Sequence, residues 1–593
     1  MALPPIYRIH PAIGIARVGN AARDTFFIGP EAPGRGPTGD ATVGTRVPDF
    51  KASGKLKPQG ARFRIWEYVD KKGKYEPSRE INLDEKDCVN VVWTVHLANR
   101  KASFFKFKNL AGEERPHASG SRRNDTVVDR RTLEIDPQSR VISGRTARPV
   151  EFRKGTSRNP ASELWPSPAP SPPIEYLGEL RTDAAGRLIV IGGNGQSSAV
   201  PGMALGADVF NNDGWFDDVS DGPVTATLTL RGQDKKPKVI VAESAWVLCG
   251  PPDFAPFLAN QVTLYDVLFD MAAREMVLPT NEALYDLSLK PLAEINAEFK
   301  AAGGPTLSRY KPSFDQEIFP ILRRAQEQIF VFEGLKDSHG SLGAYARLGD
   351  PSAANLSARQ AVFDRIHPPG LAGSGGARNM PILHGDEFSN PTHQRKALTL
   401  TATQYALLEQ WSKGQFIAGA GPVPPPPPAA TVSPEGLDRS ALQNCVGGAF
   451  CPGIEIGWQI RNKKLFAAPF RIDHRASSQY LGDAGPVRAG HFSRQMALPW
   501  QTDFLACRLQ TGRGWWPAQR PDITYASKAA FDASPRVFRA WHRASSGGAT
   551  VNWPSGGAVP SGQEFIDNLH KLGVVREEPA SYHVERERDP DVP

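Results

Sequence analysis

The spacing of apolar residues changes near Pro252, and this change constrains the fold more than any other feature of the sequence. Before it, short apolar or alternating runs are separated by Gly, Pro, Asn and Asp, a pattern typical of β-strands. After it, apolar residues recur at helical spacing. The clearest predicted strands are 89–98, 187–193, 224–230 and 238–248, and the predicted helices are 261–275, 314–332 and 401–415.

These patterns predict an α+β fold. We expect a strand-rich N-terminal domain over residues 1–256, packed on a mixed, loop-rich C-terminal region with several helices over 257–575. A polyproline connector is expected at 419–430, because its consecutive prolines cannot continue a helix or a central strand. Residues 576–593 are expected to form a frayed or disordered tail.

Charge and targeting signals narrow the class of protein. The net charge of +7 is mild for 593 residues, so nucleic-acid binding is not expected. The N-terminus lacks the features of a signal peptide, and no apolar run is long enough to cross a bilayer. The sequence therefore predicts a soluble, cytoplasmic protein without membrane association.

The cysteines and histidines do not have the spacing of a metal site. The five cysteines are too few and too scattered for a disulfide scaffold or a zinc ribbon. Cys88 and Cys249 lie in apolar runs and are expected to be core residues. Six histidines, far apart in the sequence, have no local ligand spacing, so no metal is predicted: His10, His96, His384, His474, His491 and His542.

Common cofactor and ligand motifs are absent from the sequence. The acidic stretch 211–223 resembles a calcium loop, but Val209 and Ser220 stand where ligands are required, so a turn between strands is predicted. No complete dinucleotide fingerprint, phosphate loop, paired-histidine zinc motif or nucleophile elbow is present. An ordinary flavin, nicotinamide or metal enzyme is therefore not indicated.

One segment, 499–522, collects unusual chemistry. Asp503 precedes Cys507 by four residues, and Cys507 is followed by the adjacent indoles of Trp515 and Trp516. If the loop between them turns back, the thiol lies against an indole with a carboxylate as proton acceptor. By spacing alone, packing of Cys on Trp and a capping or arginine-binding role for Asp503 remain alternatives.

The chain also resembles the cysteine tryptophylquinone amino-acid oxidases, a family that includes L-lysine ε-oxidases and glycine oxidases. The resemblance extends over essentially the whole chain. It is carried by IHPAIGIARVGN (9–20), FFIGPE (26–31), ARFRIWEY (61–68), VHLANRKASFF (95–105), LGELRTDAAGRLIVIGG (177–193), NNDGWFDDVSDGPVTAT (211–227), PPDFAP (251–256), FCPGIE (450–455), PWQTDF (499–504) and WWPAQRPD (515–522).

The resemblance implies a quinone derived from the protein itself, formed from a Cys thioether and an oxygenated Trp. Residue by residue, it assigns the thioether to Cys507 and the carboxylate needed for cofactor formation to Asp503. We expect Asp503 also to act as the base that accepts the substrate proton. The quinone is expected on Trp516 or Trp515. The enzyme would then deaminate a primary amine or amino acid oxidatively in the C-terminal region, with O2 as co-substrate and ammonia and H2O2 as products.

The resemblance further implies a flavoprotein maturation partner and a homo-oligomer, a dimer or a tetramer. Cys445, Cys451 and His542 are the additional residues expected near the pocket, with ordinary packing as the alternative reading. The expected substrate is a small amino acid, an amine or a residue within a peptide.

Two other functions remain as alternatives to an amino-acid oxidase. One is a peptide-modifying oxidase or oxygenase with the same cofactor, and the other is a homologue that has lost the cofactor and only binds a ligand.

Overall fold

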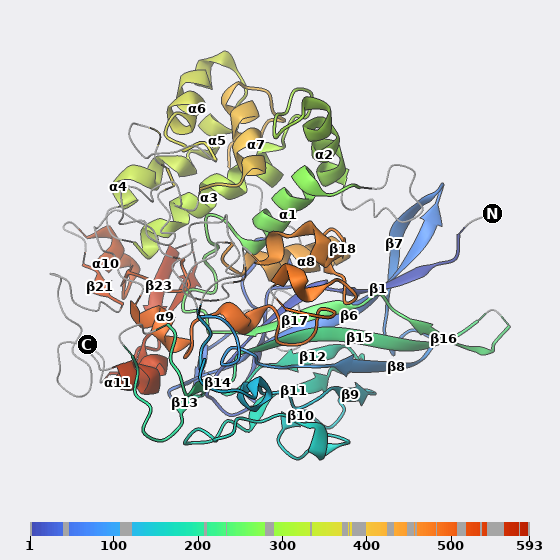
Figure 1. The fold of residues 1–593 in the computed structure, drawn as a ribbon. Helices are drawn as coiled ribbons and strands as arrows, with labels where there is room; N and C mark the ends of the chain where they lie inside the picture. Colours follow the sequence, from blue (N-terminus) through green and yellow to red (C-terminus); the bar gives the residue numbers. More distant parts are fainter. Residues whose placement is uncertain are drawn as a thin grey trace.

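The computed structural model confirms the α+β class. It describes residues 3–39, 47–106, 121–206, 210–232, 234–278, 290–332, 335–369, 378, 380–381, 399–423, 432–447, 453, 456, 459–481, 483–506, 517–533, 537–541, 562–579 and 582–590. A large sheet lies on one side of the molecule, and most of the helices form a lobe on the other (Figure 1).

The sheet has 13 strands in the described chain, and its main path is β10-β11-β12-β6-β2-β17-β15-β8-β9. Strands β1, β3 and β7 also pair with β6, and β16 pairs with β15. The bounds are β1 Ile6–His10, β2 Ile13–Arg17, β3 Phe27–Ile28, β6 Gln59–Lys71, β7 Lys74–Ile81, β8 Cys88–Val95, β9 Arg140–Ser143, β10 Val150–Arg153, β11 Tyr176–Thr182, β12 Leu188–Ile191, β15 Ser220–Arg231, β16 Pro237–Val241 and β17 Ala245–Gly250.

Strand β15 shows why these segments form a sheet. Its residues Val224, Ala226 and Leu228 are buried in the core of the N-terminal domain, and the threonines between them are only partly buried. This alternation matches the two-residue period of a strand with one face on a core. The predicted strands 89–98, 187–193 and 224–230 are confirmed as β8, β12 and β15, and the run 238–248 forms two strands, β16 and β17.

The helical lobe confirms the three predicted helices. They are α1 Leu264–Glu275, α3 Phe319–Glu327 with a π-helical turn before it, and α7 Ala402–Ser412. Helix α1 begins at a capping box in which Thr263 and Asp266 satisfy each other's backbone N–H groups. The remaining helices are α2 Lys290–Ala302, α4 Leu335–His339, α5 Tyr345–Leu348, α6 Leu356–Phe363, α8 Pro434–Gln443, α9 Gln501–Ala506, α10 Lys528–Asp532 and α11 Gly562–Asn568.

The prediction that residues 576–593 form a frayed or disordered tail is wrong. Strands β22 (Val574–Glu578) and β23 (Tyr582–Arg586) form an antiparallel hairpin near the C-terminus. The side chains of Val584 and Glu585 are buried, and Glu585 binds Arg588 and the Thr524 hydroxyl. The buried charge of Glu585 is therefore paired within the fold, which offsets part of the cost of burying it.

The prediction for 211–223 is also incomplete, because strand β14 (Trp215–Asp217) lies inside it and pairs with β13 (Ser197–Ala199). Its short length hid the strand, since three residues carry no readable period. The proline run at 424–428 lies outside the described residues.

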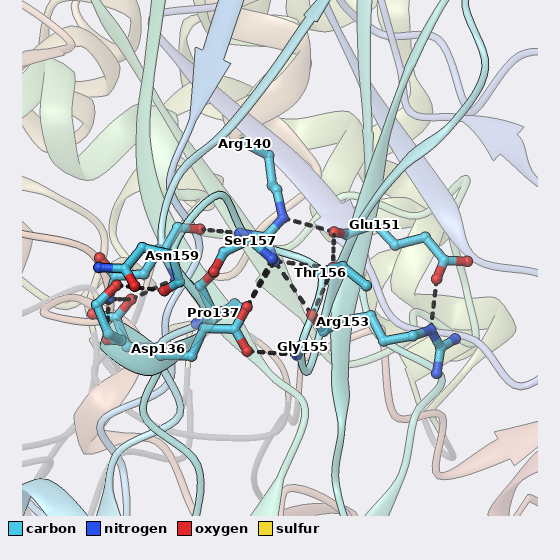
Figure 2. Close-up of polar contacts among 12 residues, drawn as sticks. Asp136, Pro137, Arg140, Glu151, Arg153, Gly155, Thr156, Ser157 and Asn159 are labelled. Atoms are coloured by element: carbon cyan, nitrogen blue, oxygen red, sulfur yellow. Dashed lines mark hydrogen bonds and ion pairs between the residues drawn. The ribbon is translucent and has the colours of Figure 1, made fainter.

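Buried Arg140 secures the edge of the sheet. Its guanidinium donates to the carbonyls of Pro137, Glu151 and Arg153 and to the Thr156 hydroxyl (Figure 2). Burial lowers its pKa, and Glu163 partly compensates. One side chain thereby satisfies two carbonyls of β10 and one in the loop before β9.

Candidate active site

Helix α9 carries the predicted base. Asp503 lies in its first turn and is buried, with only 3% of its surface exposed. Trp500 and Phe504 flank it in a core that also includes Val18, Phe254 and Trp541. The Phe254 ring lies 5.8 Å from that of Phe504 and 4.8 Å from that of Trp541. Asp503 is therefore buried beside an apolar core rather than placed at a solvated helix end.

The β13–β14 pair of the N-terminal domain and the loop before it anchor the start of α9. The Trp500 N–H donates to Asp217 Oδ2 at 3.1 Å. The Gln501 amide donates to Gly195 O at 3.2 Å and accepts from the Ser197 hydroxyl at 2.6 Å. Both ends of that amide are used, so the orientation of the first helical turn is set by residues about 300 positions earlier in the chain.

A buried ion pair holds Asp217 itself. Lys101 Nζ binds Asp217 Oδ2, and both side chains are fully buried. Asn99 adds a hydrogen bond from Nδ2 to Asp217 Oδ1 at 2.8 Å. A buried charge requires such pairing, because its desolvation would otherwise cost several kcal/mol. Asp217 thus connects the ion pair directly to the helix of Asp503.

The segment that leads into α9 is fixed in the same way. Asn212 Nδ2 donates to Leu498 O at 2.9 Å. The Arg123 guanidinium donates to Met496 O at 2.9 Å and to Arg494 O at 3.2 Å. The sequence predicts only a turn at 211–223. Its role in supporting α9 is missed because contacts between distant segments carry no local sequence signal.

Asp218 is a second unusual carboxyl beside this anchor. Its Oδ2 accepts from the Gln196 N–H at 3.1 Å, and a side chain at Gly193 would come within 2.4 Å of it. Burial, followed by the charge of Asp217, raises the pKa of Asp218 to about 8. This carboxyl is therefore largely protonated at neutral pH.

Residues after the predicted tryptophans return to α9. Arg520 Nε donates to Phe504 O at 2.7 Å, so the chain on either side of 507–516 lies together. Ala518 N donates to Asn260 Oδ1 at 2.8 Å, and Gln519 O accepts from Phe254 N at 3.2 Å. Three segments that are distant in the sequence, around Phe254, Phe504 and Ala518, therefore meet at the site.

Several predicted site residues are not among those the structure describes. These are Cys507, Trp515, Trp516, Cys451 and His542. Their assignments stay predictions. Trp541, which sequence reasoning passed over in favour of its neighbour His542, is fully buried in the core beside α9 and donates from Nε1 to Gly573 O at 2.8 Å.

Cys445 is described and lies at the end of helix α8. It is fully buried, and burial raises the pKa of its thiol to about 12. Arg17 lies next to it, donating to Asn444 O at 2.6 Å and facing Asp253 at 3.6 Å. Cys88 and Cys249 are buried as expected, and burial raises the pKa of the Cys249 thiol to about 12. Such thiols are neutral and unreactive at pH 7.

Four of the six histidines considered above are described and contact protein groups, and His384 and His542 lie outside the described residues. His10 Nδ1 lies 3.0 Å from Asp438, His96 Nε2 lies 2.7 Å from Asp136, and His491 Nε2 lies 3.1 Å from Asp483. His474 packs edge-on against Trp246. Within the described ranges, no group of three or more His, Cys, Asp or Glu side chains is arranged to hold a metal ion. Nor does any described helix have the length and apolarity to span a membrane.

A cavity of about 850 Å³ lies elsewhere, between β1, β16, α1 and the hairpin at 466–472. His10, Glu243, Tyr265, Arg471 and His474 are among its lining residues, and Asp503 is not. Arg471 is committed internally, because it donates to Ile9 O and Ser244 O. The guanidinium of Arg471 is therefore already used by the fold.

Comparison with known proteins identifies the family. The profile "L-Lysine epsilon oxidase N-terminal" matches residues 10–249, and "L-lysine epsilon oxidase C-terminal domain" matches residues 381–529. L-lysine 6-oxidase of Marinomonas mediterranea is 30% identical over 561 residues, covering 85% of this chain and 71% of that protein. The chain belongs to the L-lysine ε-oxidase family, so the resemblance predicted from its motifs is confirmed.

Solved structures agree over nearly the full length. The crystal structure of the L-Lys ε-oxidase from Marinomonas mediterranea has a TM-score of 0.75 and 25% identity, covering 98% of this chain and 95% of that one. The structure titled as the Schiff base intermediate of that oxidase with L-Lys matches with the same values.

Proposed function

We propose that this protein is a quinoprotein oxidase that deaminates a primary amine or amino acid oxidatively. O2 is the electron acceptor, and ammonia and H2O2 are the products. Support comes from the relative named L-lysine 6-oxidase and from the solved oxidase structure titled with L-Lys as a Schiff base. One observation carries the proposal: Asp503 is buried on α9, and Arg520 returns the chain after the two tryptophans to that helix.

The residues present fit a cofactor built from the chain. Cys507 follows Asp503 by four residues, and Trp516 or Trp515 supplies the indole. A protein-derived quinone of this kind provides an electrophilic carbonyl that takes up an amine and two electrons. No dissociable flavin is needed in turnover, although a flavoprotein partner for maturation remains part of the proposal, as does a homo-oligomer.

The chain's own groups have distinct tasks in this mechanism. Asp503 accepts the proton that leaves the substrate carbon. This role requires its carboxylate to lie within hydrogen-bond reach of that proton. The contacts of Asp217, Lys101 and Gln501 fix the position of helix α9 and so of the Asp503 carboxylate that it carries. Asp503 is buried, so bulk water is kept from its carboxylate, which strengthens its electrostatic interactions.

Peptide mass spectrometry across 499–522 and 537–541 tests the proposal. The protein is expressed together with a flavoprotein that assists cofactor maturation. The expected result is a Cys507 thioether to an oxygenated Trp515 or Trp516. A cross-link from Cys507 to Trp541 would support the proposed quinone but place it on Trp541 instead of Trp515 or Trp516. Unmodified Cys507 in protein that also releases no peroxide from amines would contradict the proposal.

A further inference from the structure

A second cavity, of about 610 Å³, lies inside the helical lobe. Its walls come from α3, α4, α5, α6 and α7, which lie together in that lobe (Figure 1). Ile321, Leu348, Ile366 and Leu408 are among the apolar side chains that line it, and all four are buried. Asp503 is not a lining residue. A mainly apolar cavity of this size between helices is typical of a small-molecule site.

Arg365, just after α6, is held at the cavity by its backbone. Met380 also lines the cavity, and its N–H donates to Arg365 O at 2.7 Å. The N–H of His367 donates back to Met380 O at 2.7 Å. The main chain that carries Arg365 is therefore fixed where the side chain reaches the cavity.

Arg347 and Arg365 place two positive charges at the cavity mouth. Both residues line the cavity and are exposed. Among the described residues, neither guanidinium has a hydrogen bond or an ion pair. Asp364, the neighbour of Arg365, binds Arg378 at 3.1 Å instead. Two uncompensated charges beside an apolar cavity favour an anionic group there.

Arg359 of helix α6 provides the contrast. It is fully buried and donates to Pro351 O at 3.3 Å and to Ser352 O at 3.2 Å. The lobe is thus able to engage an arginine where the fold needs one. Arg347 and Arg365 are not engaged in this way, although water alone satisfies many exposed arginines.

Gln261 supplies a second, independent observation at the inner wall. This residue lines the cavity, is only 4% exposed, and its Nε2 has no hydrogen-bond partner. Buried amides are nearly always hydrogen-bonded, so this exception requires an explanation. A ligand in the cavity contacts the side chain of Gln261 and is able to supply the missing partner.

The other titratable groups of the lining leave its net charge positive. His339 is buried with Nδ1 3.2 Å from Ala325 O, and burial lowers the pKa of its ring, which is therefore neutral at pH 7. Asp337 is exposed and has contacts of its own. Its single negative charge is outweighed by the two arginines.

We propose that this cavity binds a carboxylate with a long apolar body and a hydroxyl or carbonyl group at its far end. The carboxylate binds Arg347 and Arg365, because a guanidinium matches a carboxylate in charge and geometry. The apolar body packs against the buried aliphatic side chains. The far-end group pairs with the amide of Gln261, which accepts either chemistry. An ω-hydroxy fatty acid has all three features.

Calorimetry on the full chain tests the ligand class with three matched probes. These are ω-hydroxydecanoate, decanoate, which lacks the far hydroxyl, and α,ω-decanediol, which lacks the carboxylate. We expect ω-hydroxydecanoate to bind most tightly. Decanoate is expected to bind about 5-fold more weakly and the diol at least about 10-fold more weakly, because a bond to a charged group contributes more than a neutral one.

Four variants test the position of the ligand. Arg347→Gln and Arg365→Gln are each expected to weaken both carboxylates about 10-fold and the diol less than about 2-fold. Gln261→Leu is expected to abolish the preference for ω-hydroxydecanoate over decanoate. Ala361→Trp, at an exposed position on the cavity wall, obstructs the space and is expected to weaken all three probes.

Arg475→Gln is the matched control. Arg475 is also an exposed arginine, but it lines the cavity of about 850 Å³ between β1 and β16. Its replacement is expected to leave binding of all three probes unchanged. Thermal melting without ligand shows that each variant is folded, and the two exposed arginine positions of the mouth tolerate glutamine even if Gln261→Leu does not fold.

Three results overturn the inference. One is wild-type binding of ω-hydroxydecanoate weaker than about 1 mM. Another is equal affinity for the carboxylates and the diol, since the arginines then play no part. The third is a loss in Arg475→Gln as large as in Arg347→Gln, which places the ligand in the other cavity. Binding is measured without turnover, so failure of the proposed oxidase function does not affect these results.

Discussion

Asp217 connects a buried lysine to the helix of the proposed catalytic base. Its Oδ2 binds Lys101 Nζ and also accepts the backbone N–H of Trp500, three residues before Asp503. The strand that carries Asp217 and the helix that carries Asp503 are separated by more than 280 positions along the chain. A residue of the N-terminal domain thereby sets the place of a group in the C-terminal region.

Replacement of Lys101 by Met tests this connection. It leaves Asp217 as an uncompensated buried charge, and we expect a loss of about 3–5 kcal/mol in the free energy of unfolding. Urea denaturation measures it, and quinone absorbance reports whether α9 still supports cofactor formation. The double variant Lys101→Met with Asp217→Asn removes the charge and is expected to recover part of the loss. A loss below about 1 kcal/mol in the single variant would contradict the buried pair.

Asp218 predicts a pH dependence of stability. Its pKa is raised by burial to about 8 from an ordinary value of 3.8. Between these values the folded protein holds a proton that the unfolded chain releases, so this group lowers stability as pH rises across that window. The Asp218→Asn protein lacks this decline. We expect it to melt at an increasingly higher temperature than wild type from pH 5 to pH 8.5 in calorimetric scans, and parallel profiles would rule the raised pKa out.

Replacement of Asp503 by Asn tests the two roles assigned to this carboxylate, cofactor formation and proton transfer, and quinone absorbance distinguishes them. The isosteric amide cannot accept a proton from the substrate carbon, and we expect peroxide release to fall by at least about 100-fold. Asp438→Asn is the control, because that carboxylate binds His10 and the Ala12 N–H, away from α9. The control is expected to lose stability and keep its activity per quinone. Full activity of the Asp503→Asn protein would exclude Asp503 as the base.

The C-terminal hairpin predicts that the last residues stabilise the domain. Val584 is fully buried, so Val584→Ala is expected to cost about 2 kcal/mol. Val128→Ala is the matched control, since Val128 is 96% exposed and its truncation leaves stability unchanged. Chemical denaturation distinguishes the two. Equal midpoints would restore the disordered tail that the sequence alone predicted.

Local patterns were enough for the elements whose packing is simple. Strand β15 alternates buried and partly buried residues, and α1 repeats apolar residues at helical spacing after its capping box. Both periods follow from backbone geometry, so they can be seen in the chain without knowledge of its partners. Strand β14 and the hairpin of β22 and β23 were not predicted, because their formation depends on contacts with segments that are distant in the sequence.

By itself, the sequence determined the α+β class, the family, and the grouping of Asp503 and Cys507 with two tryptophans within one segment. Only the tertiary structure decided that Lys101, Asp217 and Trp500 meet and that Arg520 returns to Phe504. The physical reason is that hydrogen bonds and ion pairs between distant segments depend on how whole elements pack. They leave no periodic mark on the residues that make them.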